Sequence, residues 1–264
     1  MKLLLDKVAL VTGAAHELGM GFNTAKKLAE AGAKVVLSDL PERQEEVEAR
    51  VLELSQQGYE VMSMVLDVTD SSQAKVCVEA AVQKWGHIDI LFNNAGSPDG
   101  VGAFLEMTDA QWDSSYQVNI KGPVSLCRAV IPFMKKQGGG VIINNASLLG
   151  LGSKANLAGY CATKAALISL SKTLAAEFAE DNIRVNAICP GNIWTQMSEL
   201  EVKIYTDQGQ NREQVIEQMG KEVPIGRWGK ATDVANSVVF LCSEHGSYIT
   251  GAALPVAGAL VAGL

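Results

Sequence analysis

The chain has 264 residues, a formal net charge of −7 and 48% hydrophobic residues. The acidic balance, without a stripe of Lys or Arg, argues against a nucleic-acid-binding surface, and the hydrophobic content is too high for a disordered chain. The start MKLLLDKVAL has only three leucines before Asp6, too few for a signal peptide or a membrane span. We therefore expect a globular cytoplasmic protein with neither nucleic-acid nor membrane partners.

No Pro/Ser-rich linker, low-complexity run or internal repeat divides the sequence, which favours one domain over residues 1–264. The five cysteines show no C-x-x-C pairing, so reduced and buried thiols are expected. The three histidines are scattered, and no metal site is predicted.

Strand and helix patterns alternate along the chain. The predicted strands are 7–13, 33–39, 59–67, 88–96, 141–147, 183–191 and an apolar segment at 249–258. The predicted helices are 21–31, 42–57, 71–85, a helical stretch near 109–136, 160–178 and 231–243. This alternation predicts an α/β fold, a doubly wound parallel sheet of the Rossmann type with helices on both faces. Ligands of such folds bind beyond the carboxyl ends of the strands.

A glycine-rich turn, with Gly13, Gly19 and Gly21, follows the first predicted strand. Glycines let the backbone turn tightly and approach a pyrophosphate, which the N-terminus of the following helix attracts. Asp39 ends the second strand, where a carboxylate can accept hydrogen bonds from both hydroxyls of an adenosine ribose. The same charge would repel a 2′-phosphate, so NAD is predicted rather than NADP. A capping role for Asp39 is compatible with this function.

Tyr160 and Lys164 are four residues apart and share one face of a predicted helix. A free tyrosine loses its proton near pH ~10. A neighbouring cation favours the phenolate and should draw that pKa towards neutrality. Ser147 ends the strand before this helix and can place a hydroxyl on the same substrate oxygen. Tyr-x-x-x-Lys is a weak motif alone, but here a serine-bearing strand and a nucleotide-binding turn accompany it.

Together these motifs resemble the short-chain dehydrogenase/reductase family along nearly the whole chain. The matching blocks, in the family's order, are VTGAAHELGMG (11–21), SD (38–39), LDVTD (66–70), NNAG (93–96), VNIKG (118–122), NAS (145–147), YCATK (160–164) and PGNIWT (190–195). The resemblance implies an NAD-dependent enzyme that transfers a hydride between nicotinamide and a secondary alcohol or ketone. It also implies a homotetramer, although the tail ALPVAGAL (253–260) departs from the acidic-Gly-Gly ending of relatives.

The resemblance implies four catalytic residues. Tyr160 would exchange a proton with the substrate hydroxyl or carbonyl, and Ser147 would orient and polarise that oxygen. Lys164 would lower the tyrosine pKa and bind the nicotinamide ribose. Asn119 would hold a water that links Lys164 to solvent.

Most residues of the implied cofactor site lie at or after the carboxyl ends of predicted strands. Adenine would lie against Asp67 and Val68, and the nicotinamide carboxamide against Thr195. The full implied set is Gly13, Gly19, Met20, Gly21, Asp39, Asp67, Val68, Asn94, Ala95, Gly96, Tyr160, Lys164, Pro190, Gly191, Ile193 and Thr195.

The glycine-rich turn departs from the family pattern, which has three residues between the first two glycines where this chain has five. One alignment keeps the usual spacing, places Glu17 where glycine is expected and lengthens the start of the helix. The other treats 14–18 as a longer loop and keeps Gly19-Met20-Gly21 intact. We favour the longer loop.

By the same resemblance, residues of about 193–223 form the substrate lid. Residues 196–223 show no strand pattern and one helix, at 211–221. The PGNIWTQM block is similar to that of sugar- and hydroxysteroid-oxidising members, so a polyol or sugar-like substrate is the leading hypothesis. A hydroxysteroid or alicyclic alcohol is the alternative if the lid is apolar inside, and a non-catalytic NAD-sensing regulator is a third. The candidate substrate-binding residues are Leu149, Asn156, Asn192 and Trp194.

Overall fold

The computed structural model describes residues 2–260, apart from the side chains of residues 200, 201 and 204. Seven parallel strands form one sheet in the order β3-β2-β1-β4-β5-β6-β9. They are β1 (Val8–Thr12), β2 (Lys34–Asp39), β3 (Val61–Val65), β4 (Ile90–Asn93), β5 (Gly140–Asn145), β6 (Ile183–Pro190) and β9 (Ala253–Val256). The order reverses between β1 and β4, as in a doubly wound Rossmann-type sheet, and confirms the predicted fold class.

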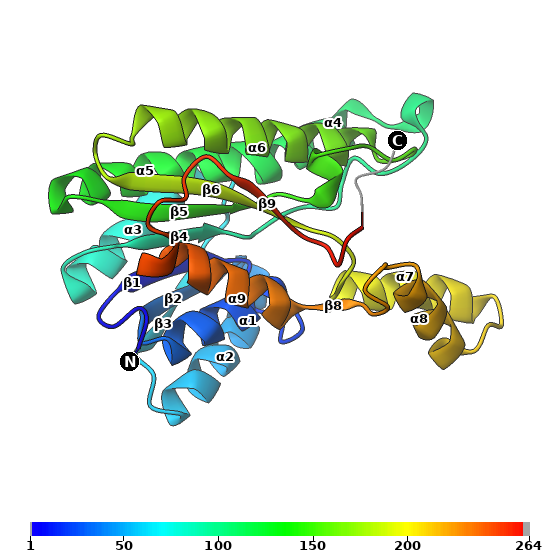
Figure 1. Ribbon diagram of the computed structural model, residues 1–264, viewed down its shortest axis with the longest axis horizontal. Helices are drawn as coiled ribbons and strands as arrows, with labels where there is room; N and C mark the ends of the chain where they lie inside the picture. The colour runs from blue at the N-terminus through cyan, green and yellow to red at the C-terminus, as the bar shows by residue number, and fades with distance from the viewer. Residues whose placement is uncertain (1, 261–264) are drawn as a thin grey trace.

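Helices cover both faces of the sheet (Figure 1). The α-helices are α1 (Met20–Glu30), α2 (Gln44–Gln56), α3 (Ser71–Trp85), α4 (Asp109–Tyr116), α5 (Gly122–Gln137), α6 (Ala158–Glu177), α7 (Gln196–Asp207), α8 (Arg212–Lys221) and α9 (Ala231–Cys242). Short 3-10 turns occur at Pro41–Arg43, Phe104–Glu106, Leu148–Gly150 and Glu244–Gly246. Across residues 2–260, no helix has the length and apolarity needed to cross a membrane.

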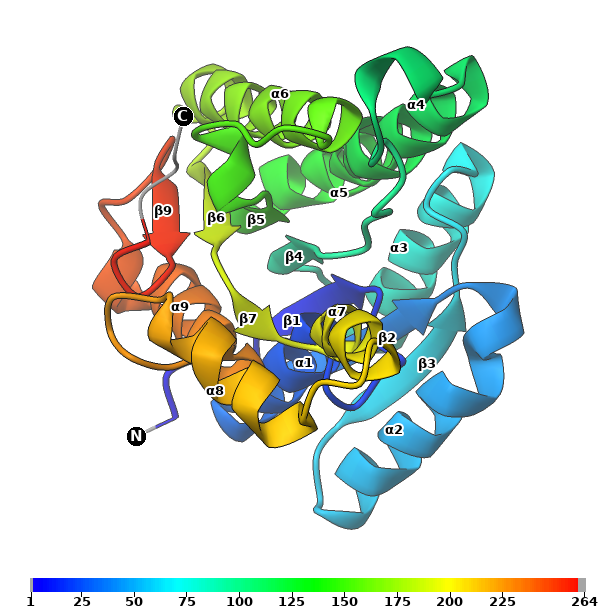
Figure 2. The same ribbon diagram turned by 90° about the vertical axis from the view of Figure 1, so that its right-hand side faces the viewer.

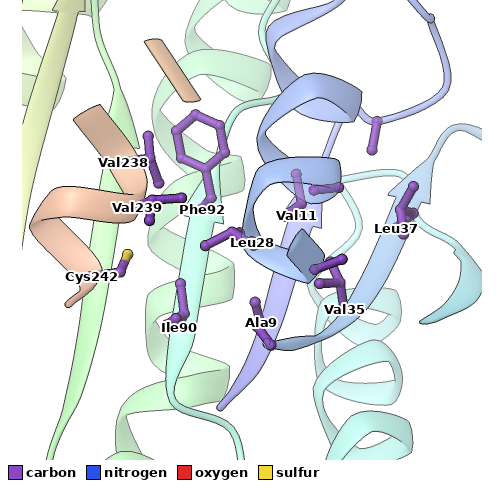
Figure 3. Packing of buried hydrophobic residues seen from close by; sticks show 14 of the residues in the cluster. Ala9, Val11, Leu28, Val35, Leu37, Ile90, Phe92, Val238, Val239 and Cys242 are labelled. Carbon is purple, nitrogen blue, oxygen red and sulfur yellow. The ribbon is translucent and has the colours of Figure 1, made fainter. Parts of the chain in front are cut away.

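The strands are apolar on both sides because both sides are buried. Alternate residues of the central strands, including Val11, Val35 and Phe92, face α1, α2 and α9 (Figure 3). The intervening residues, including Leu10 and Leu91, face α3 and α5. All five cysteines are buried and unpaired, as predicted. Because the strands are parallel, their carboxyl ends, and the polar residues that follow them, meet at one edge.

Helix boundaries follow local signals where those are strong. Asp70 caps α3 by accepting hydrogen bonds from the backbone of Ser72 at 2.8 Å and Gln73 at 3.4 Å. The helix ends at Gly86, whose φ of +86° suits glycine. The helical stretch predicted near 109–136 is divided into α4, a π-turn at Gln117–Lys121 and α5. Pro123 lies in the first turn of α5, directly after the π-turn.

The prediction of one helix within residues 196–223 was wrong, because the lid contains α7 as well as α8. Figure 2 shows both helices at the carboxyl edge of the sheet. The two ends of the lid are joined at its base, where β7 (Ile193–Trp194) pairs with β8 (Gly229–Lys230). Helix α7 packs on α8, and its Glu199 pairs with Arg212 of α8 at 2.8 Å, so its partners come from a later segment of the chain.

Candidate active site

The glycine-rich turn holds the backbone of β1 close to the start of α1. Gly13 has a φ of +65°, and a Cβ there would lie 3.0 Å from the Cα of Ala95. A Cβ on Gly21 would overlap the Gly13 carbonyl, so two glycines are required for this approach. Gly19 caps α1, which begins at Met20. The alignment of this turn with the family pattern stays a prediction.

Asn94 ties this turn to the neighbouring strands. Its Nδ2 donates to the carbonyls of Thr12 at 2.8 Å and Gly13 at 3.0 Å. Its Oδ1 accepts a hydrogen bond from Nδ2 of Asn145 at 3.0 Å. The Thr12 hydroxyl accepts from the backbone of Asn94 and Ala95, each at 3.0 Å. No role was predicted for Thr12 or for the Asn145 side chain, although both residues lie at the carboxyl ends of central strands.

A cavity of about 320 Å³ opens above these strand ends. Ten residues of the implied cofactor set line it: Gly13, Gly19, Met20, Asp39, Asp67, Val68, Asn94, Ala95, Gly96 and Thr195. Seven further lining residues had no predicted contact: His16, Leu40, Arg43, Leu66, Val118, Gln196 and Met197. Six implied residues lie outside the lining: Gly21, Tyr160, Lys164, Pro190, Gly191 and Ile193. Gly21 acts through the close approach to Gly13 described above.

Asp39 stands at one end of this cavity and is buried. Its two carboxylate oxygens accept hydrogen bonds from the backbone of Ala15 at 2.9 Å and Leu40 at 3.0 Å. The carboxylate therefore also fixes the glycine-rich turn. Arg43 lines the same end but makes a bidentate pair with Glu46, at 3.0 and 2.7 Å. That pairing raises the pKa of Arg43 and engages Nε and one Nη of its guanidinium.

Ser147, Tyr160 and Lys164 are brought together at the carboxyl end of β5. The buried Ser147 hydroxyl accepts a hydrogen bond from the backbone N–H of Leu149 at 3.1 Å and lies beside the Tyr160 phenol. Lys164, 4% exposed, donates from Nζ to the Asn145 carbonyl at 2.8 Å. The same Nζ lies 5.6 Å from the centroid of the Tyr160 ring. The arrangement can present a hydroxyl, a phenol and an ammonium group to one small ligand.

The prediction that Tyr160 has a lowered pKa was wrong for this geometry. Burial raises the pKa of the Tyr160 phenol, and the hydrogen bond from Ser147 opposes that rise only in part. Burial also lowers the pKa of Lys164 to about 8. The cation is directed to the Asn145 carbonyl rather than to the phenol oxygen, and desolvation penalises both charges.

Asn119 is buried in the π-turn beside this group. Its Oδ1 accepts from the backbone of Ser97 at 2.9 Å, and its Nδ2 donates to the Thr163 hydroxyl at 3.2 Å. A Cβ on Gly96 would lie 3.3 Å from Asn119 Oδ1 and 3.5 Å from Lys164 Nζ. Asn119 and Lys164 therefore flank the end of the cavity at Gly96. The water-holding role of Asn119 stays a prediction.

The pKa of Lys164 leads to a prediction on stability. Its folded value of about 8 lies below the ordinary 10.5. Below pH 8 the lysine is protonated in both states, so the folded protein bears the full cost of the buried charge. Between pH 8 and 10.5 only the unfolded chain keeps the proton, so that cost fades as pH rises. We expect Lys164→Met to be more stable than wild type at pH 7, by ~1–3 kcal/mol, and the gain to shrink towards pH 10.

Guanidinium unfolding at pH 7 and pH 9.5 measures this difference. Lys172→Met removes an exposed lysine from the same helix and is the matched control, with no pH-dependent gain expected. A gain for Lys164→Met that is equal at both pH values would show that the buried charge is not its cause.

The four candidate substrate residues are dispersed. Leu149 is half-buried beside Ser147, whereas Asn156 is exposed with a φ of +64°. Asn192 lines a different cavity, of about 350 Å³, between the base of the lid and β9. Trp194 packs edge-to-face on Trp228 with ring centroids 5.3 Å apart. That contact gives the tryptophan a packing role at the base of the lid.

Comparisons with known proteins agree with this geometry. The model of the family described as enoyl-(acyl carrier protein) reductase matches residues 13–259. A 3-oxoacyl-(acyl-carrier-protein) reductase of Thermotoga maritima is 38% identical, over 98% of this chain and 99% of the relative. Levodione reductase of Leifsonia aquatica is 35% identical, over 96% of this chain and 93% of the relative.

Solved structures show the same similarity. A levodione reductase has a TM-score of 0.87 and 35% identity, covering 97% of each chain. A 7α-hydroxysteroid dehydrogenase in complex with NADH and 7-oxo glycochenodeoxycholic acid has a TM-score of 0.88 and 35% identity, covering 99% of this chain and 96% of that one.

Proposed function

The chain belongs to the short-chain dehydrogenase/reductase family of oxidoreductases, and we propose that it transfers a hydride between NAD and a secondary alcohol or ketone. The observation that carries this proposal is proximity. One cavity runs from Asp39, past the glycine-rich turn, to Gly96. A Cβ on Gly96 would lie 3.5 Å from Lys164 Nζ, and Lys164 lies in the same cluster as Tyr160 and Ser147.

The lining residues fit a dinucleotide. The close approach of Gly13 and Gly21 leaves backbone and the N-terminus of α1 exposed to a pyrophosphate. Asp39 offers its remaining lone pairs to a ribose, and its charge would repel a 2′-phosphate. These features support NAD. Thr195 and Met197, at the start of the lid, would close over the far end of the cofactor.

Bound NAD supplies the hydride acceptor, or NADH the donor. The chain itself handles the proton and the charge on the substrate oxygen. Tyr160 gives a proton to a ketone oxygen or takes one from an alcohol, and the Ser147 hydroxyl donates to the same oxygen as charge develops there. The raised pKa of Tyr160 keeps the phenol protonated at neutral pH, the form that ketone reduction requires.

A panel of secondary alcohols and ketones tests the proposal, with NAD(H) and NADP(H) supplied separately and turnover followed at the nicotinamide absorbance. We expect turnover with NAD(H). Binding of NADH without any turnover would favour an NAD-sensing regulator, a function that the intact Ser147, Tyr160 and Lys164 cluster argues against.

Asp39 provides a prediction on cofactor choice. In Asp39→Ser, NAD should bind more weakly, by about 1.5–3 kcal/mol, because a charged acceptor is lost. NADP should bind more tightly than it does to wild type, because the repulsion between Asp39 and its 2′-phosphate is relieved. The ratio of kcat/KM for NAD to that for NADP should therefore narrow.

The control for this prediction is Asp39→Asn, which removes the charge but keeps an oxygen for the backbone N–H of Ala15. If only Asp39→Ser changes the ratio, the cause is the loosened turn. If wild type already prefers NADP, the cofactor assignment is wrong.

We also propose a homotetramer in the cytoplasm, by analogy with the family. A monomer in gel filtration at micromolar concentration would contradict the assembly.

A further inference from the structure

Two pairs of asparagines stand side by side where β4 and β5 end. Asn93 and Asn144 are partners in the strand register, and Nδ2 of Asn93 donates to Oδ1 of Asn144 at 2.8 Å. In the next pair, Nδ2 of Asn145 donates to Oδ1 of Asn94 at 3.0 Å. Successive side chains of a strand point to opposite faces of the sheet, so the two pairs have different surroundings.

The two asparagines of β5 contact different helices. Nδ2 of Asn144 donates to the Ser171 hydroxyl of α6 at 2.8 Å. Nδ2 of Asn145 lies 4.0 Å from Sδ of Met20, the first residue of α1, which also lines the cofactor cavity. Asn144 therefore attaches α6 to the sheet, whereas the side chain of Asn145 is directed to the nucleotide side of the site.

Asn145 also joins the glycine-rich turn to the catalytic lysine. Its backbone carbonyl accepts the hydrogen bond from Nζ of Lys164 at 2.8 Å. Its side-chain partner, Asn94, donates to the carbonyls of Thr12 at 2.8 Å and Gly13 at 3.0 Å. One residue thus holds the buried ammonium group with its carbonyl and is tied to the turn by its amide.

The orientation of the Asn145 amide follows from these bonds. Both donor bonds of Asn94 are made by its Nδ2, so its Oδ1 must accept, and the Asn145 nitrogen must face it. Oδ1 of Asn145 is one of three buried side-chain oxygens without a hydrogen-bond partner within residues 2–260. A buried oxygen without a donor costs stability. Folding alone would favour an apolar side chain of this size, so the amide calls for a functional explanation.

We infer that Asn145 is a positioning residue: the hydrogen bond from its amide to Asn94 fixes its carbonyl, and through it the Lys164 ammonium group, relative to the glycine-rich turn. The inference rests on the proposed function, in which the turn binds NAD and Lys164 acts beside Tyr160 on the same cofactor. Asn145 acts through Lys164. A displacement of about 1 Å in such a site can cost ~10²-fold in rate.

Two variants remove the donor to Asn94. Asn145→Leu does so at nearly constant size, and Asn145→Ala does so without the bulk of leucine. In both, kcat for ketone reduction should fall ~10–100-fold. The midpoint of guanidinium unfolding should not fall in Asn145→Leu, because the variant also removes the unpartnered oxygen. A loss of kcat that only parallels a loss of stability in both variants overturns the inference.

The matched control is Asn186→Ala. Asn186 is a buried asparagine of β6, the strand beside β5, and its amide has both partners. Its Nδ2 donates to the Ile249 carbonyl at 2.9 Å, and its Oδ1 accepts from the backbone N–H of Ala252 at 3.0 Å. This variant should show the opposite result, with a lower unfolding midpoint and an unchanged kcat of the folded enzyme.

A measurement on Lys164 itself needs no turnover. The titration of its Cε resonance is followed by NMR without substrate, and the signal is assigned by its absence in Lys164→Met. A carbonyl acceptor favours the ammonium form, so displacement of the Asn145 carbonyl should lower the pKa of Lys164 below its wild-type value of about 8. Tyr160 and Cys189, the titratable groups beside Lys164, are present in every variant.

The outcome of this titration separates the two hypotheses. The lowered pKa should appear in Asn145→Ala, which adds no hydrocarbon around the lysine, as well as in Asn145→Leu, and not in Asn186→Ala. If it appears but no alcohol or ketone is turned over by wild type, Asn145 positions Lys164 and only the proposed hydride transfer fails. An unchanged Lys164 titration in both Asn145 variants overturns the inference, whatever their kcat.

Discussion

Tyr160→Phe is expected to lower kcat by ~10²–10⁴, the usual contribution of a positioned general acid or base. The phenol is the group that can exchange a proton with the substrate oxygen, and Phe keeps the ring above Lys164 while removing only the hydroxyl. The fold and the binding of NADH should be retained. Steady-state kinetics of ketone reduction and a fluorescence titration with NADH measure the two effects separately.

The matched control for this variant is Tyr248→Phe, which removes the same hydroxyl from a fully exposed tyrosine. That variant should have wild-type turnover. Wild-type turnover in a folded Tyr160→Phe protein would falsify the acid–base assignment.

Ser147→Ala is expected to lower kcat by ~10²–10³, because the substrate oxygen loses a donor directed at its developing charge. The variant also removes the acceptor for the Leu149 N–H, so the turn after β5 must be shown to persist. Ser147→Thr keeps a hydroxyl and should retain more activity than Ser147→Ala. Thermal unfolding and NADH binding, measured beside kcat, distinguish loss of the donor from loss of the fold.

The double variant Ser147→Ala/Tyr160→Phe adds a second measurement. The two hydroxyls lie beside each other and would serve one oxygen, so their effects should be far from additive. A double variant whose loss equals the product of the single losses would show that the two groups act independently.

The sequence determined the sheet and the position of the candidate site. Strands buried on both faces are apolar throughout, and helix α3 carries its own cap and stop in Asp70 and Gly86, so its bounds could be predicted from local residues. Parallel strands place all their carboxyl ends at one edge. For that reason Asp39, Asn94 and Ser147, far apart along the chain, could be expected together before any contact was known.

Other features could be known only from the tertiary structure, because they depend on contacts with residues from distant segments of the chain. Helix α7 needs α8, and the role of Trp194 follows from Trp228, which is 34 positions later in the chain. The side chain of Asn145 has a role because Asn94 faces it. The pKa of Tyr160 rises rather than falls, because spacing along a helix brings a cation near but says nothing of the burial that penalises both charges. Periodicity records which face of an element is buried, whereas desolvation and pairing depend on what the fold places against it.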